Sequence, residues 1–205
     1  MKTIIHLFIL CVISQICYSQ NLITDENTVL KRGIYKTFDE FKTNTPSLDL
    51  SYEIKGYVNA LESPYHDSIY NLKIEKNKTK EIGLVWGFCD GKNVYVNMSR
   101  DYFSGKKVFK PGSDFYKLLL VDRYCYFIYV DIDHGCQQAP YVIDFNDDNE
   151  MCLNCSLVHH YFDDILSLDR DLWNEYKNDK SKSDLYLKYL TLFSKKHKED
   201  IKTKK

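Results

Sequence analysis

The sequence predicts an α+β fold, an antiparallel β-sheet of about seven strands followed by two or three C-terminal helices. Between Leu48 and Phe145, apolar and polar residues alternate within short segments that are joined by turns, which is typical of an antiparallel sheet. After residue 156 the apolar residues recur every three or four positions, as they do on amphipathic helices. Aromatic residues are abundant and glycine and proline are scarce, so we expect a globular chain with a packed core.

Turn signals separate the predicted strands. Asp90-Gly91, which lies between two apolar segments, is the strongest short signal for a hairpin. The apolar stretch 115–133 is too long for one strand, and we expect two strands that are hinged near Asp122-Arg123. The predicted strand segments are 51–59, 70–77, 83–89, 92–98, 115–133 and 141–145.

One short helix is expected before the sheet. Thr37 and Glu40 have the spacing of a capping box, in which a hydroxyl and a carboxylate bond the unpaired N–H groups of the first turn. Phe38 and Phe41 share a face, and the helix must end before Pro46, so we predict a helix over 37–43.

The C-terminal helices carry apolar stripes, which we interpret as core. The first stripe leads from the sheet into the helical part, and the other two follow it at similar spacing. The residues of the three stripes are Val158, Tyr161, Phe162, Ile165 and Leu166, then Leu172, Trp173 and Tyr176, then Leu185, Tyr186, Tyr189, Leu190 and Phe193.

The N-terminus has the layout of a secretory signal peptide. Lys2 provides a positive charge, 4–16 is mostly apolar, and Cys17 and Ser19 form a small-x-small cleavage site. The apolar run is too short to cross a bilayer as a helix. We therefore predict a signal peptide over 1–19, an exported mature chain that is periplasmic or secreted, and no transmembrane segment after cleavage.

The mature chain has the length of one domain. We predict a flexible lead-in over 20–32, a single α+β domain over 33–198 and a basic tail over 199–205. The net charge of the full sequence is −1, without the basic excess that would hold a phosphate backbone. Nucleic acid is therefore not expected as a partner.

Five cysteines follow the predicted cleavage site, and they form two groups. Cys89 and Cys125 sit inside apolar strand patterns, where cysteine behaves as a small buried hydrophobic residue. The other three occupy predicted loops. Because disulfides persist in exported proteins, one interpretation is a disulfide of Cys136 with Cys152 or Cys155.

A zinc site is a second interpretation of the loop cysteines. Cys152 and Cys155 have C-x-x-C spacing, and His159 with Cys136 would complete a tetrahedral set of ligands. Zinc modules usually have a second C-x-x-C pair, however, whereas this sequence has a single such pair. The third interpretation is unbridged thiols at the point where strands give way to helices, and we expect no cofactor.

The segment DFNDDNE, residues 144–150, places oxygen-bearing side chains at alternate positions, like the start of a calcium loop. It departs from such a loop in two places. Asn149 stands where the sharp turn requires glycine, and Cys155 stands where the loop requires a bidentate glutamate. The alternative interpretation is a polar turn after a strand, which needs no ion.

Catalytic motifs are sparse. The sequence has no Gly-x-Ser-x-Gly elbow and no phosphate-binding glycine loop, and we assign no catalytic residue. The alternative to a non-enzymatic chain is a hydrolytic or metal-assisted enzyme. In that interpretation the loop residues Asp131, Asp133, His134 and Cys136 act together with His159.

Four segments resemble an uncharacterised family of exported domains of the Bacteroidota. They are GIYKTFDEFKTNTPS, WGFCDGKNVYVN, the YCYF strand and the lysine-rich C-terminal helix pair. The opening motif G-I-Y-x-T-x-x-E-F-x-x-N-x-P is the most specific, with Gly33, Tyr35, Phe41, Asn44 and Pro46. The resemblance implies a periplasmic or surface location, a structural role for the motif and no known activity. We therefore expect a non-enzymatic exported domain that binds an unknown protein or envelope component, or has a structural role there.

Overall fold

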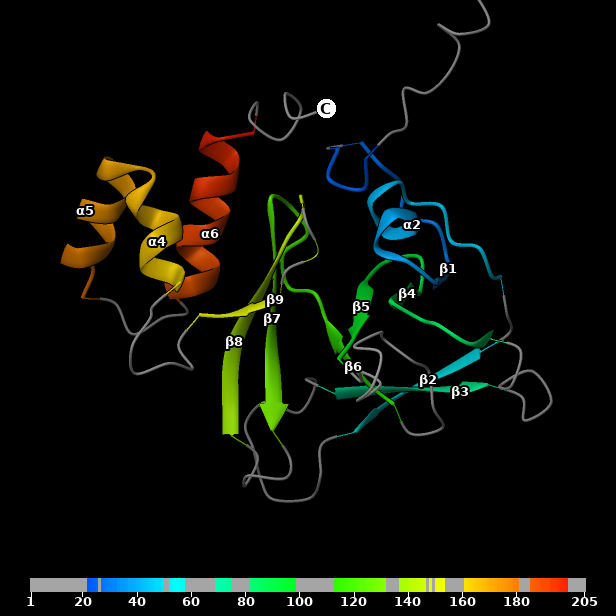
Figure 1. Cartoon of the computed structure of the whole chain (residues 1–205). Coiled ribbons are helices and arrows are strands. Elements are labelled where there is room, and N and C mark those ends of the chain that lie inside the picture. The colour runs from blue at the N-terminus through cyan, green and yellow to red at the C-terminus, as the bar shows by residue number, and fades with distance from the viewer. Residues whose placement is uncertain are drawn as a thin grey trace, which may run out of the picture.

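The computed structural model describes residues 22–25, 27–49, 52–57, 69–74, 82–98, 113–131, 137–146, 148, 150–153, 161–180 and 185–198. Within these ranges the chain forms strands and helices in the predicted order, a short helix among strands followed by a helical C-terminal part. The predicted α+β class is therefore confirmed (Figure 1). The described strands number nine and form two sheets, where the sequence predicted about seven in one.

The larger sheet has six strands, all antiparallel, in the order β1-β4-β5-β6-β3-β2. β4 and β5 form the predicted hairpin. Its loop spans 90–93, and the Asp90 carboxylate accepts the Lys92 and Asn93 N–H groups at 2.7 and 2.6 Å. The strands are β1 Gly33–Tyr35, β2 Tyr52–Tyr57, β3 Ile69–Ile74, β4 Gly87–Cys89, β5 Val94–Asn97 and β6 Asp114–Lys117.

The smaller sheet has three antiparallel strands, β7 Tyr124–Asp131, β8 Gln137–Asp144 and β9 Glu150–Cys152. The predicted hinge near Asp122-Arg123 is confirmed, because β6 ends at Lys117 and β7 begins at Tyr124. The hinge is also the point where the chain leaves one sheet and enters the other. The two strands that the sequence did not predict are β1 and β9, each only three residues long.

Three helices cover the smaller sheet on the face away from the larger one (Figure 1). They are α4 Tyr161–Ser167, α5 Arg170–Asn178 and α6 Leu185–Lys196. Tyr124, Tyr126 and Val142 of the sheet form one core with the buried faces of these helices. The predicted apolar stripes are therefore core in the part of the chain that the structure describes, except for Tyr161, which is 39% exposed.

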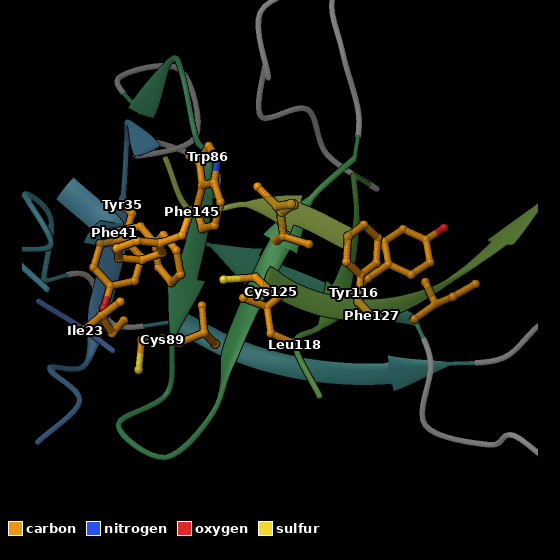
Figure 2. Close-up of a cluster of buried hydrophobic side chains, with 14 of the residues drawn as sticks. Ile23, Tyr35, Phe41, Trp86, Cys89, Tyr116, Leu118, Cys125, Phe127 and Phe145 are labelled. Atoms are coloured by element: carbon orange, nitrogen blue, oxygen red, sulfur yellow. The ribbon is translucent and has the colours of Figure 1, made fainter. Parts of the chain in front are cut away.

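A second core lies between the two sheets. Alternate residues of β4, β5 and β6 point toward it, while their neighbours, among them Phe88, Tyr95 and Phe115, form a third core on the other face. Figure 2 shows Tyr35, Phe41, Trp86 and Phe145 gathered at one end of the second core. The Phe41 and Trp86 rings stack there with centroids 4.3 Å apart. Aromatic pairs of this kind add to the stabilisation from buried area.

Helix α2, Phe38–Lys42, begins and ends as predicted. Thr37 is its N-cap, and the Thr37 hydroxyl accepts the Glu40 N–H at 3.2 Å. The Glu40 carboxylate accepts the N–H of Lys36, one residue before the cap, at 2.6 Å. The two bonds satisfy donors at the start of the helix, as a capping box does.

Part of the predicted lead-in is packed against the rest of the chain. Ile23 is 5% exposed and belongs to the core between the sheets, and its N–H donates to the Lys42 carbonyl at 2.9 Å. Asn44 holds the same segment through Val29 and Lys31. Ile23, Val29 and Lys31 thus contact the rest of the chain, while the flexible lead-in over 20–32 stays a prediction.

Candidate functional site

The predicted metal and disulfide residues fall mostly outside the described residues. Of the set Cys136, Cys152, Cys155 and His159, the structure describes Cys152, which ends β9. Cys152 is disulfide-bonded, and since Cys89 and Cys125 are free thiols, its partner lies outside the described residues. A sulfur in a disulfide has no thiolate with which to bind zinc. The pairing of Cys136 with Cys152 or Cys155 stays a prediction.

Most of the loop residues of the alternative enzyme likewise lie outside the described residues. Asp131 ends β7 and pairs in register with Gln137 of β8, while Asp133, His134 and Cys136 lie outside the described residues. Among the residues that the structure does describe, no group of three or more histidine, cysteine, aspartate or glutamate side chains could hold a metal.

The acidic segment after β8 uses its oxygen atoms within the protein. Asp144 accepts the Asn146 N–H at 2.9 Å and lies 3.5 Å from the guanidinium Nε of Arg123. The Asn146 side-chain oxygen, in the amide orientation that suits its neighbours, accepts from Arg123 at 2.9 Å. The side-chain oxygen atoms of Asp144 and Asn146 thus both contact the Arg123 guanidinium.

Asp148 in the same segment bonds the larger sheet. The Asp148 backbone has a φ of 58°, a left-handed conformation that aspartate tolerates better than most residues do. Its carboxylate accepts the indole N–H of Trp86 at 2.8 Å. The acidic segment is therefore a polar turn that joins the two sheets, the interpretation that needs no ion.

The five residues of the opening motif lie around β1 and α2. Gly33 has a φ of 154°, and a Cβ built there would lie 2.6 Å from the Pro46 ring, so only glycine fits against this proline. Tyr35 and Phe41 are fully buried, with ring centroids 5.9 Å apart. Asn44, in a left-handed conformation, accepts the Tyr35 hydroxyl at 3.0 Å. The motif thus holds α2 against β1.

The two described free thiols are buried in the core between the sheets. Burial raises the pKa of the Cys125 thiol well above its usual range, and it raises that of the Cys89 thiol as well. Because the thiolate is the reactive form, these thiols are unreactive in the folded protein. The prediction that both behave as buried hydrophobic residues agrees with their position.

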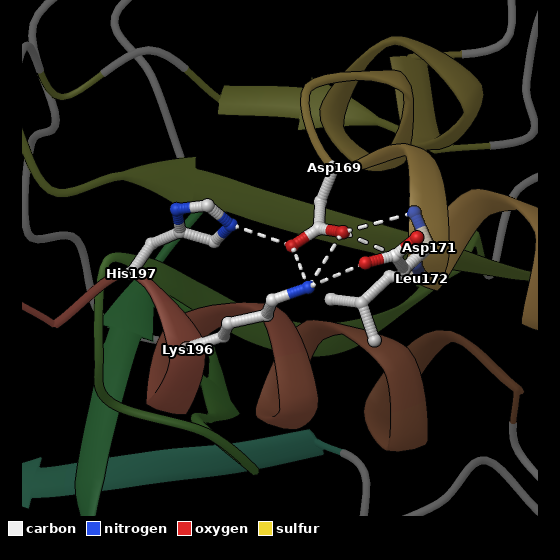
Figure 3. A network of polar contacts seen from close by, with 5 residues as sticks. All are labelled: Asp169, Asp171, Leu172, Lys196 and His197. Carbon is white, nitrogen blue, oxygen red and sulfur yellow. Dashed lines mark hydrogen bonds and ion pairs between the residues drawn. The ribbon is translucent and has the colours of Figure 1, made fainter.

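A carboxylate that the sequence analysis did not single out organises the helical layer (Figure 3). Asp169 is 6% exposed and is the N-cap of α5, where it accepts the N–H groups of Asp171 and Leu172 at 3.1 and 3.2 Å. From the end of α6, the Lys196 ammonium lies 2.8 Å from it and the His197 Nε2 lies 2.9 Å from it. Four groups, from α5 and from the C-terminal end of α6, thus converge on one side chain.

The electrostatics of this network favour its charged form. Burial would raise the pKa of the Asp169 carboxyl, but hydrogen bonds from Lys196, His197 and Leu172 outweigh it and hold the pKa far below its usual range. The bond to Asp169 also raises the pKa of Lys196. An anion at the N-terminus of α5 and a cation at the C-terminus of α6 both suit the helix dipoles.

His197 connects the network to the smaller sheet. Its ring stacks on that of Phe193 with centroids 4.4 Å apart. The Phe193 ring centroid in turn lies 5.9 Å from that of Tyr124 in β7. A histidine oriented by a buried carboxylate also occurs in general-base pairs. Here the carboxylate at the same time caps a helix and binds a lysine, so the contacts describe a connection between α5 and α6.

One signal in the sequence could have revealed Asp169. An aspartate directly before a helical apolar pattern is a typical N-cap, and Asp169 precedes the stripe that begins at Leu172. Its partners Lys196 and His197 follow by 27 and 28 residues and meet it only through helix packing.

Comparisons with known proteins found no protein similar to this chain. No family model matches the chain, and neither a curated protein nor a solved structure matches it. In the part of the chain that is described, no helix is both long enough and apolar enough to cross a membrane.

Proposed function

We propose that the chain is an exported α+β domain with a non-enzymatic binding or structural role in the periplasm or cell envelope, in keeping with its resemblance to exported domains of the Bacteroidota. The observation that carries the proposal is the disulfide at Cys152. Disulfides form and persist in oxidising compartments and are rare in the cytosol of ordinary cells. The signal-peptide pattern over residues 1–19 points to the same compartment.

The chemistry of the described residues supports a role without catalysis. The buried Asp169 carboxylate is engaged by α5 and by residues at the end of α6. In the acidic segment, Asp144 and Asp148 bind Arg123 and Trp86. The buried thiols have raised pKa values. Each of these groups stabilises the fold, which favours binding or structure over catalysis.

The test is fractionation of a Gram-negative host that expresses the full sequence. We expect the protein in the periplasmic or envelope fraction, with its mass shortened by residues 1–19. The matched control lacks residues 2–19 and should stay in the cytoplasm. Full-length protein in the cytoplasm, with Met1 and Lys2 retained, would contradict the proposal.

Metal analysis separates the enzymatic alternative from this proposal. Protein purified without chelator should contain no stoichiometric zinc or calcium. Stoichiometric metal that is lost in a Cys136→Ser or His159→Ala variant would favour the enzyme that uses Asp131, Asp133, His134, Cys136 and His159.

A further inference from the structure

We propose that two copies of this chain associate edge to edge through β2, as an antiparallel pair centred on Ile54. Among the strands that the structure describes, β2 is an end strand of the larger sheet, with all six of its residues paired to β3 on one side. An edge strand presents a row of backbone N–H and C=O groups that can pair with another strand. Figure 1 shows β2 and β3 on the side of the molecule away from α4, α5 and α6, so this association leaves the helical layer untouched.

The proposed occupant is a second copy because the edge is complementary to itself. When β2 pairs antiparallel with its own copy around Ile54, Glu53 lies opposite Lys55 of the second copy, and Lys55 lies opposite its Glu53. Opposite charges directly across two strands stabilise the pair. A two-fold axis through Ile54 makes the two contacts equivalent, which is the usual symmetry of homodimers.

The same charges select this register over its neighbours. A shift by two residues in one direction places Glu53 opposite Glu53, and a shift in the other direction places Lys55 opposite Lys55. Like charges directly opposite each other destabilise a strand pair. A shift by one residue instead pairs the charged face of one strand with the apolar face of the other, the face on which Ile54 packs against the third core.

Within one copy, the Glu53 and Lys55 side chains are accessible, and Glu53 lies near two lysines. Glu53 is 61% exposed and Lys55 is 56% exposed. The Glu53 carboxylate lies 4.0 Å from the Lys55 ammonium and 3.9 Å from that of Lys73 on β3, so one carboxylate serves two cations. The Glu53 of a second copy would provide Lys55 with a carboxylate of its own.

Two charge-reversal variants test the pairing. Glu53→Lys places lysine opposite lysine at both contacts, and Lys55→Glu places glutamate opposite glutamate. We expect wild-type protein at about 100 µM and low salt to sediment as a dimer. For each variant alone, we expect a dimer dissociation constant that is higher by about tenfold or more. A Lys180→Glu control makes the same charge change at an exposed position after α5 and should dimerise like wild type.

Mixing the two variants is the decisive step. In a mixed pair every contact is again lysine opposite glutamate, so an equimolar mixture should form a dimer with one copy of each, detected by native mass spectrometry with one variant labelled with ¹⁵N. A monomeric wild type, variants that dimerise as well as wild type, or a mixture of folded variants that stays monomeric would each overturn the proposal. If a variant does not fold, as judged by circular dichroism, the wild-type measurement alone decides.

Discussion

Asp169 holds two helices through one buried carboxylate, so its removal should weaken the whole helical layer. We expect Asp169→Ala to lower the free energy of unfolding by about 2–4 kcal/mol, because it deletes an N-cap and leaves a cation without its buried partner. Urea denaturation followed by circular dichroism measures this loss. Asp171→Ala is the matched control, since the Asp171 side chain is 90% exposed and contacts Lys196 at 3.6 Å. Its effect should stay within about 0.5 kcal/mol, and equal losses would contradict the assigned role.

The low pKa of Asp169 predicts how this contribution depends on pH. The folded pKa lies below the unfolded value of about 3.9. The stabilisation is therefore fully present above about pH 4 and is lost as the pH falls through the folded pKa. The difference in unfolding free energy between wild type and Asp169→Asn should be largest at neutral pH and should shrink in acid. A difference that is the same at pH 7 and pH 2 would rule out the assigned pKa direction.

At the residue scale, the sequence predicts local bonds better than distant ones. The Thr37 cap depends on residues within one turn, and it was predicted correctly. The contact of Asp169 with His197 depends on how α5 packs against α6, which no spacing in the sequence encodes. The ion pair of Asp144 is unpredictable for the same reason, because Arg123 reaches Asp144 from an earlier part of the chain.

Among the elements, α2 is fastened by the residue that follows it. Asn44 is 4% exposed with a φ of 50°, and its side chain bonds Tyr35, Lys31 and Val29. Asn44→Ala should therefore lower the free energy of unfolding by about 3 kcal/mol, since it leaves buried polar groups unpaired and replaces asparagine, which tolerates the left-handed region, with alanine, which tolerates it less well. Thermal and urea denaturation both measure this loss of stability.

Asn44→Gly separates the two causes. Glycine accepts the left-handed conformation without the Cβ penalty but still loses the three hydrogen bonds. Its effect should be smaller than that of alanine by about 1 kcal/mol. A Thr45→Ala variant at the exposed neighbouring position should change little. If alanine and glycine destabilise equally, the left-handed conformation is not a cause.

Element types and breaks follow from the sequence, but the order of the strands does not. The 90–93 hairpin and the hinge at Asp122-Arg123 are local signals, and the structure contains both. The pairing of β3 with β6 joins segments about forty residues apart, and period-two alternation is the same whichever strand lies alongside.

At the scale of the whole molecule, the fold is three layers in which the smaller sheet is the middle one. One face of β7 packs against the helices through Tyr124 and Tyr126, and the other packs against the larger sheet through Cys125 and Phe127. Strands buried on both faces read as continuous apolar runs. The run YCYFIYV, residues 124–130, is therefore typical of a strand in a middle layer. Its composition predicts a strand and also that both faces of the strand are buried.

Cys152 lies where this middle layer is followed by the helical part of the chain. β9 is three residues long, and Leu153 directly after it is 1% exposed in the core beneath the helices. The disulfide at Cys152 therefore lies at the edge of the smaller sheet, beside a residue of the core beneath the helices. The two buried thiols, in contrast, do not distinguish an exported protein from a cytosolic one.

Disulfide mapping of protein recovered from the periplasmic fraction tests this central claim most directly. The protein is alkylated without reduction under denaturing conditions, digested, and analysed by mass spectrometry. The account predicts that the Cys152 peptide is joined to another cysteine peptide, that Cys89 and Cys125 are alkylated, and that the N-terminal peptide begins at Gln20. A Cys152 recovered as an alkylated thiol, together with an intact Met1, would contradict it.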